Sequence, residues 1–197
     1  MNPGPTGGVV GPVPDGRDPD DYDRLRRRLL WALPTGLYVL GSHAGDRYNL
    51  MTVSWVTQVC MEPKMVAVGI ESSSVTYGLV AASKTFTISL LPRSQRTVVR
   101  RFVKPVQDAV VAPETGAGTM HGEAVRLAPG GAPVLSVAAA WLQCAVRQEL
   151  ELGSHCLVVG EIDDCGSGAP GQAPSADTSE AISELLRMED TRMNYGG

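Results

Sequence analysis

Two clusters of small hydroxyl-bearing residues could hold a phosphorylated ligand. The first occupies residues 49–57, where Thr and Ser alternate with Val and Trp, and the second is the triple serine that begins at Ser72. Both clusters lie at the ends of neighbouring strand-like segments, where backbone N–H groups and hydroxyls can bind a phosphate and the edge of a flat ring. The pattern indicates a nucleotide-like cofactor, although the same alternation is also typical of an ordinary half-exposed strand.

The segments that would position these clusters follow one another in a fixed order. Residues 34–40 precede the first cluster, residues 62–68 follow it, and residues 86–91 come after the serines. Further strand-like segments occupy residues 131–135, 140–144 and 153–162. This series resembles the flavin reductase-like family of FMN-binding split barrels, over residues 25–165 and again over residues 192–197. The resemblance implies a mainly β fold, an antiparallel Greek-key split β-barrel with a few short helices.

The composition and charge of the chain fit a single globular domain. With 197 residues, of which 43% are hydrophobic, the chain can bury one core of ordinary size. The formal net charge of -4 argues against nucleic acid or an anionic membrane as a partner, since both select for concentrated positive charge. Because we find neither a membrane-spanning apolar stretch nor a signal-peptide pattern, we expect a cytoplasmic protein. The four cysteines lack paired metal spacing, so we expect them to be small buried residues and expect no metal site.

Breaks in composition divide the chain into a tail, a domain and an internal linker. The Gly- and Pro-rich residues 1–19 are expected to form a mobile tail ahead of one domain at 20–197. Within that domain, residues 166–179 are expected to be a flexible linker. Apolar residues at helical spacing predict a helix over 20–33.

Hydrophobic patterns also predict the elements of the barrel. Short antiparallel strands are expected across residues 37–91, interrupted by a short helix at 76–83. The later expected elements are a helix at 94–104, a loose region at 105–131, strands at 138–150 and 156–162, and a helix at 180–188.

The resemblance implies that the flavin ring lies against the first hydroxyl cluster and the flavin phosphate against the second. In the family, backbone amides of the first segment face the polar edge of the isoalloxazine, where donors stabilise the negative charge of the reduced ring. Short hydroxyls in the second segment can reach the FMN phosphate without crowding it. The expected cofactor contacts are Asn49, Met51, Thr52, Val53, Ser54 and Trp55 in the first segment and Ser72, Ser73, Ser74 and Tyr77 in the second. The alternatives are a plain barrel strand and a polar serine turn.

His155 is the expected catalytic residue. It lies in the tripeptide Gly153-Ser154-His155, which resembles the family's Gly-Asp-His motif near the nicotinamide and the flavin. Histidine exchanges protons near neutral pH, so this side chain could bind the pyridine nucleotide or manage a proton at the reduced ring. A structural role at the start of a strand is the alternative. Two positions depart from the family pattern, since Ser154 replaces the usual acidic residue and Ser89 replaces a frequent Asn.

The resemblance implies an NAD(P)H-dependent flavin reductase. Hydride would pass from C4 of the nicotinamide of NADH or NADPH to N5 of FMN, with FAD as the other candidate flavin. The implied partners are a second copy of the chain, in a homodimer, and a flavin-dependent monooxygenase that receives the reduced flavin. Two alternatives stay open: an FMN prosthetic group that reduces another acceptor or a biosynthetic intermediate, and a flavin-binding or cofactor-free barrel without enzymatic activity.

Two further motifs lack the context that their function needs. The glycines of residues 166–171 have the spacing of a dinucleotide fingerprint, but Pro170 and the Gly- and Pro-rich stretch after it prevent the helix that must meet the pyrophosphate. The sequence from His121 to Glu123 matches the start of a zinc deaminase signature, without the later cysteine pair. We expect that segment to be a surface loop.

Overall fold

The structure is a computed structural model that describes residues 11–168, 170–171 and 184–191. The chain divides into two compact units, Met1–Pro34 with Met193–Gly197 and Thr35–Arg192. The first ten residues of the expected mobile tail lie outside the described residues. The second unit holds every strand that the structure describes.

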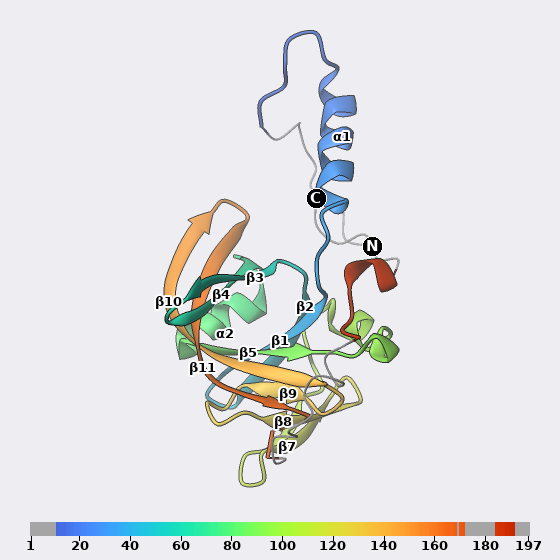
Figure 1. The fold of residues 1–197 in the computed structure, drawn as a ribbon. Coiled ribbons are helices and arrows are strands. Elements are labelled where there is room, and N and C mark those ends of the chain that lie inside the picture. Colours follow the sequence, from blue (N-terminus) through green and yellow to red (C-terminus); the bar gives the residue numbers. More distant parts are fainter. Residues whose placement is uncertain (1–10, 169, 172–183, 192–197) are drawn as a thin grey trace. The chain divides into compact units, whose positions relative to one another are not determined.

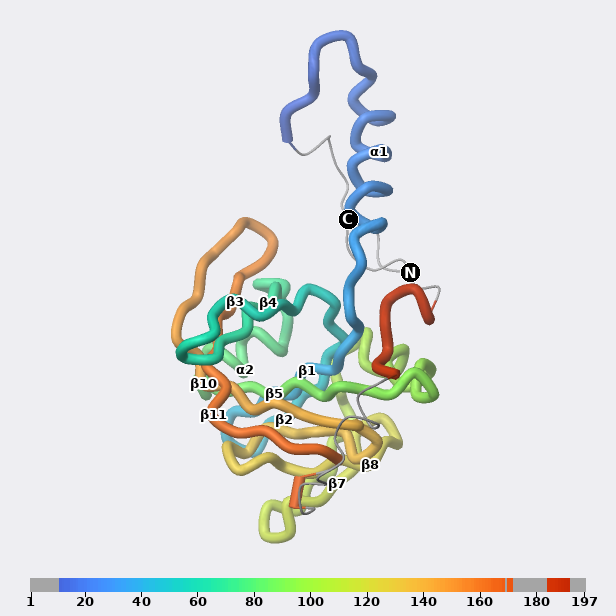
Figure 2. Tube along the Cα trace, in the orientation of Figure 1, coloured from blue at the N-terminus to red at the C-terminus, as the bar shows by residue number. Residues whose placement is uncertain are grey.

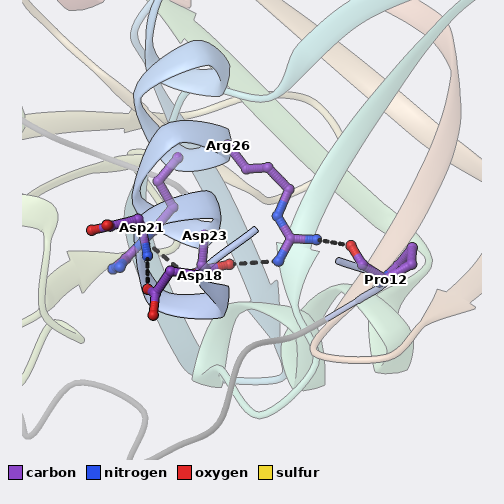
Figure 3. A network of polar contacts seen from close by, with 6 residues as sticks. Pro12, Asp18, Asp21, Asp23 and Arg26 are labelled. Carbon is purple, nitrogen blue, oxygen red and sulfur yellow. Dashed lines mark hydrogen bonds and ion pairs between the residues drawn. The ribbon is translucent and has the colours of Figure 1, made fainter. Parts of the chain in front are cut away.

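The first unit contains the predicted helix, α1 (Pro19–Trp31). The side chain of Asp18 caps the helix by accepting a hydrogen bond from the backbone of the first turn at 2.9 Å. Arg26 donates from Nη2 to Asp23 at 2.9 Å and from Nη1 to the carbonyl of Pro12 at 3.3 Å (Figure 3). No residue of α1 is buried, so polar contacts rather than a core hold this unit together.

A seven-stranded antiparallel sheet forms the body of the second unit and runs in the order β2-β1-β5-β10-β11-β4-β3 (Figures 1 and 2). Its strands are β1 (Tyr38–Ala44), β2 (Arg47–Val53), β3 (Val56–Met61), β4 (Lys64–Glu71), β5 (Thr85–Leu90), β10 (Ala140–Leu152) and β11 (His155–Ser167). The hairpins β1–β2 and β3–β4 lie at opposite ends of this order, yet β2 leads directly into β3. A sheet whose two ends are joined in this way must curl into a barrel. The predicted antiparallel Greek-key split β-barrel is therefore confirmed.

A second, four-stranded sheet has three of its strands in the region that was expected to be loose, and its fourth in the strand-like segment expected at 131–135. Its strands are β6 (Val110–Ala112), β7 (Ala117–Met120), β8 (Glu123–Leu127) and β9 (Pro133–Leu135), in that order. The expectation of an irregular segment at 105–131 is wrong, because these strands are too short to show an alternating pattern and pair with one another.

Strand β9 fixes the second sheet to the barrel. Thr87 donates its hydroxyl to the carbonyl of Pro133 at 2.6 Å, and the hydroxyl of Ser89 accepts a hydrogen bond from the backbone of Leu135 at 3.2 Å. Gly41 lies beneath the same carbonyl, and any Cβ at that position would collide with it. Only glycine therefore allows the two backbones to approach this closely.

The helix α2 (Val75–Ser83) packs on the core of the barrel and confirms the helix predicted at 76–83. The hydroxyl of Ser74 caps it by accepting the N–H of Tyr77 at 3.1 Å. The core that α2 covers consists of Leu40, Val53, Val66, Val68, Ile70, Val80, Phe86, Ile88, Cys144, Cys156 and Val158.

Two of the predicted helices take other forms. Residues 94–104 contain the 3₁₀ turns η1 (Arg93–Gln95) and η2 (Val98–Phe102) instead of an α-helix. Val98, Val99 and Phe102 of its apolar side are buried, but Val103 is 47% exposed. The spacing of these residues fits both helical periods and so does not distinguish an α-helix from a 3₁₀ helix.

The segment 184–191 is extended at first and then forms the 3₁₀ turn η3 (Met188–Asp190), so the helix predicted at 180–188 is wrong where the structure describes it. Leu185 and Arg187 form β-bridges with Pro92 and Gly36, because the edge of the barrel offers free backbone groups there.

Most of the linker expected at 166–179 lies outside the described residues, but its first two residues belong to β11, which runs further than predicted. Within the part of the chain that the structure describes, no helix is long and apolar enough to cross a membrane.

Candidate functional site

Trp55 and His155 lie against each other on the outer face of the barrel wall. Trp55, between β2 and β3, is 44% exposed, and His155 begins β11, where it alternates with the buried Cys156. The two ring centroids are 4.8 Å apart and the ring planes are inclined by 50°. A Cβ on Gly69 would lie 2.9 Å from Cε3 of Trp55, so glycine at this position makes room for the indole. Strand β4 thus holds the indole beside the imidazole.

Ser154 contacts His155 in place of the acidic residue of the family motif. Its Oγ lies 2.9 Å from Nδ1 of the imidazole. Its carbonyl accepts a hydrogen bond from the backbone N–H of Ser72 at 3.0 Å. The structure therefore brings the predicted catalytic histidine and the first residue of the serine cluster together through one turn.

The serine cluster contains a hydroxyl that lacks a partner. Oγ of Ser72 is buried and makes no hydrogen bond to any described residue. Such a group costs about 1–3 kcal/mol unless a ligand or water satisfies it. By contrast, Ser73 donates to Glu71 at 3.1 Å and Ser74 caps α2 through Tyr77. The first N–H groups of α2 have no carbonyl within the helix to bind, so the start of α2 beside Ser72 favours an anion.

The hydroxyl of Tyr77 lies beside the thiol of the buried Cys156. Hydrogen bonding to Cys156, burial, and the carboxylates of Glu149 and Glu151 raise the pKa of Tyr77 from 10.0 to about 12. The phenol is therefore neutral at physiological pH, and its polar atom is engaged by the thiol.

Two members of the first cluster have side chains committed to internal hydrogen bonds. Asn49 is buried, donates to the hydroxyl of Thr76 at 2.7 Å and accepts the N–H of Val106 at 2.8 Å. Thr52 is also buried and donates to the carbonyl of Val99 at 2.6 Å. Neither side chain faces the solvent, because these groups hold α2 and η2 against β2.

The remaining residues of the first cluster offer backbone rather than side-chain groups. Val53 belongs to the core, Met51 packs against it, and Ser54 is buried. Strand β2 is the last strand in the hydrogen-bonded order of the sheet, so alternate peptide groups on it point away from β1. These peptide groups are the donors that the resemblance assigns to the polar edge of the ring.

The outer face around His155 also contains residues that the sequence did not single out. Leu157 pairs with Leu150 on one side and with Gly69 on the other, and Leu152 pairs with His155 itself. Leu150 and Leu152 are 56% and 57% exposed, which leaves an apolar surface beside the indole. The alternation of Leu with Glu in residues 149–152 is the signal that could have revealed this surface.

Three residues that the sequence flagged serve the framework instead. Ser89, at a position where the family often has Asn, supports β9. Cys144 and Cys156 are fully buried as expected, and burial raises the pKa of the Cys144 thiol to about 12. The same expectation is wrong for the other two cysteines, because Cys60 is half-buried and Cys165 is exposed.

The residues present fit a phosphorylated flat-ring cofactor. An exposed indole beside an imidazole offers a surface for a planar ring, and the unpartnered hydroxyl of Ser72 at the start of α2 suits a phosphate. The outward peptide groups of β2 add donors of the kind that a flavin ring needs.

Comparison with known proteins identifies the family of this chain. Residues 30–182 match the family model described as the flavin reductase like domain. The chain is 26% identical to the stachydrine N-demethylase reductase subunit Stc3 of Rhizobium meliloti (strain 1021), over 84% of this chain and 74% of that protein. Some relatives are longer than this chain, which spans 49% of one solved oxidoreductase from Sinorhizobium meliloti 1021.

Two solved flavin reductases share the fold. The styrene monooxygenase flavin reductase from Pseudomonas putida S12 has a TM-score of 0.59 at 26% identity, over 73% of this chain and 87% of that chain. The NADH:FAD oxidoreductase SgcE6 of Streptomyces globisporus C-1027 has a TM-score of 0.62 at 26% identity, over 84% and 99%.

The fold and the site thus define a flavin-binding oxidoreductase. The chain belongs to the flavin reductase-like family, whose model matches well over half of its length. The predicted family and enzyme class are confirmed.

Proposed function

We propose that this chain uses NADH or NADPH to reduce FMN or FAD and passes the reduced flavin to a flavin-dependent monooxygenase. The observation that carries the proposal is the convergence of Trp55, His155 and Ser72 at one end of the barrel. In this arrangement the flavin ring lies against the indole and the imidazole, and its phosphate lies at the start of α2. The names of the solved relatives support the choice of substrate and partner, because one is a styrene monooxygenase flavin reductase and another is an NADH:FAD oxidoreductase.

The protein groups of this site bind and orient more than they react. When bound, the flavin supplies the hydride acceptor at its N5 atom. Ser154 occupies Nδ1 of His155, and Nε2 has no partner among the described residues, so Nε2 is the atom that holds or moves a proton. The indole of Trp55 shields one side of the imidazole from water.

Stopped-flow absorbance near the flavin band tests the proposal under anaerobic conditions. FMN-loaded or FAD-loaded protein is mixed with NADH or NADPH, and rapid bleaching is expected with at least one pair. His155→Ala should slow reduction by about a hundredfold or more, the scale of a lost acid-base group, with flavin affinity changed less than the rate. His43→Ala is the matched control, because His43 contacts the carbonyl of Gly130 elsewhere in the barrel. An unchanged rate in His155→Ala would make this residue part of the scaffold.

The exposed apolar surface beside the site supports a homodimer. Leu150 and Leu152 flank His155 and Trp55, and a second copy that covers them would also exclude water from the flavin. Leu150→Glu combined with Leu152→Glu should convert the dimer to a monomer in sedimentation analysis. Val110→Glu is the control, since Val110 is also an exposed apolar residue, on β6. A wild-type chain that sediments as a monomer would exclude the dimer.

A further inference from the structure

A pocket of about 780 Å³ lies beside η2 in the second unit. This volume is within the range of about 300–1,000 Å³ that small-molecule sites occupy, and it exceeds what a single phosphate fills. Its lining includes the cationic residues Arg100, Arg101 and Lys104, with the apolar Val103 and Pro105 between and beside them. Three cations around one pocket stand out in a chain whose net charge is -4.

The cations of this pocket are only partly neutralised. Arg101 pairs with Glu123 at 3.1 Å, and Arg100 donates one N–H to the carbonyl of Thr191 at 2.7 Å. A guanidinium has five N–H donors, so Arg100 keeps most of its donors for another acceptor. Lys104 has no ion pair or hydrogen bond to any residue that the structure describes. The pocket therefore presents positive charge to whatever enters it.

His121 closes the pocket from a strained turn. It follows β7 with a φ of 46°, and the next residue, Gly122, has a φ of 74°, which is the pattern of a tight hairpin turn. Asp108 holds this conformation, because one carboxylate oxygen lies 2.9 Å from both the backbone N and Nδ1 of His121. A non-glycine residue in this conformation costs energy and is kept where the surroundings fix it. The carboxylate is thereby engaged with His121 instead of with the cations.

The pocket adjoins the start of α2 through a single carboxamide. Asn49 binds the hydroxyl of Thr76, in the first turn of α2, with one end and the N–H of Val106 with the other. Val106 lies between Pro105 and Gln107, which both line the pocket. Asn49 thus ties the first turn of α2 to the segment that lines the pocket.

We propose that this pocket binds the adenosine 5′-phosphate half of a dinucleotide. The adenosine phosphate pairs with Arg100 and Lys104, and the base lies against Val103 and Pro105. Two dinucleotides carry this group, FAD and the pyridine nucleotide, and the pocket has the same chemistry for both. The proposal rests on the proposed function, which places a flavin phosphate at α2.

The experiment measures ADP binding to the full chain by calorimetry, without flavin or turnover. Wild-type protein should bind ADP, and Lys104→Ala should weaken this binding about fivefold, while Lys104→Glu weakens it further. Lys64→Ala, at the turn between β3 and β4, removes the same charge outside the pocket and should leave ADP affinity unchanged. Thermal unfolding of each variant shows that it is folded. If wild-type protein does not bind ADP, or if all variants bind it equally, the proposal is overturned.

Two further measurements distinguish the source of the adenosine phosphate. If FAD supplies it, Lys104→Ala weakens FAD binding and leaves FMN binding unchanged. If the pyridine nucleotide supplies it, the variant raises the KM for NADH or NADPH. The binding affinities for FAD and FMN then change equally. If ADP binding depends on Lys104 but neither NADH nor NADPH reduces the bound flavin, the proposed pocket stands and the proposed function is overturned.

Discussion

The two predicted contact segments differ in what their polar groups already bind. In residues 49–54, the carboxamide of Asn49 and the hydroxyl of Thr52 are buried and bonded to other parts of the protein. At the other segment, Oγ of Ser72 is buried without a partner and Nε2 of His155 is also unbonded within the described chain. The difference teaches that residue type alone does not mark a ligand contact. A polar group that the fold leaves unsatisfied is the better guide.

The largest effect on stability should come from removing the carboxamide of Asn49, which is bonded inside the protein. Asn49→Leu removes the hydrogen bonds to Thr76 and Val106 and should lower the free energy of unfolding by about 3 kcal/mol, since both partners lose their bond. Urea denaturation measures the loss. Thr76→Val removes one of these bonds and should cost about 1 kcal/mol. Equal losses in the two variants would contradict the bridging role of the carboxamide.

Removing the unpartnered hydroxyl of Ser72 should instead change ligand affinity and leave stability unchanged. Ser72→Ala deletes a hydroxyl with no internal partner, so the stability of the free protein should not fall, whereas the flavin Kd should rise about tenfold, or about 1.4 kcal/mol. Flavin fluorescence titration measures the Kd. Ser73→Ala is the neighbouring control, because that hydroxyl already binds Glu71. Unaltered flavin affinity in Ser72→Ala would remove this serine from the site.

A substitution at Thr52 tests the same contrast between bonded and unpartnered side chains, with a smaller effect on stability than Asn49→Leu. Thr52→Val keeps the shape of the side chain and removes its hydrogen bond to the carbonyl of Val99, which should cost about 1 kcal/mol of stability. Flavin affinity should change less than twofold, since the hydroxyl faces η2. Denaturation and fluorescence titration of one sample give both numbers. A flavin Kd that rises as much as in Ser72→Ala would place Thr52 in the site after all.

The smallest effect is confined to alkaline pH. The pKa of Tyr77 is raised from 10.0 to about 12, so the contribution of its neutral form is fully present below pH 10 and is lost as the pH rises towards 12. Tyr77→Phe cannot ionise and should lose less stability across this window than the wild type. Thermal unfolding at pH 9, 10 and 11 gives the comparison. Parallel losses in both proteins would mean that other groups govern the alkaline transition.

The sequence predicted the barrel better than the site. The order of strands from residue 37 to residue 91 and the helix after Ser74 could be read from alternation and turn chemistry. The short strands β6 to β8 could not, because three to five residues are too few to show a period, whereas β9 lies within the strand-like segment expected at 131–135. At the site, the sequence identified Trp55, Ser72 and His155, which the structure brings together. The sequence could not show that Thr52 faces inward, since the residues on both faces of that strand are of types found both in a core and at a surface.

The contact between Gly41 and the carbonyl of Pro133 limits how this chain can vary. Any side chain at position 41 would force β9 away from β1 and break the hydrogen bond that Thr87 donates to the same carbonyl. Strands β7 and β8 also contact η2, because Arg101 pairs with Glu123 and donates to the carbonyl of His121, and Met120 and Val125 are buried. Insertions or exchanges in the second sheet should therefore be accepted only where they keep Gly41, the contacts of Arg101 and these buried residues.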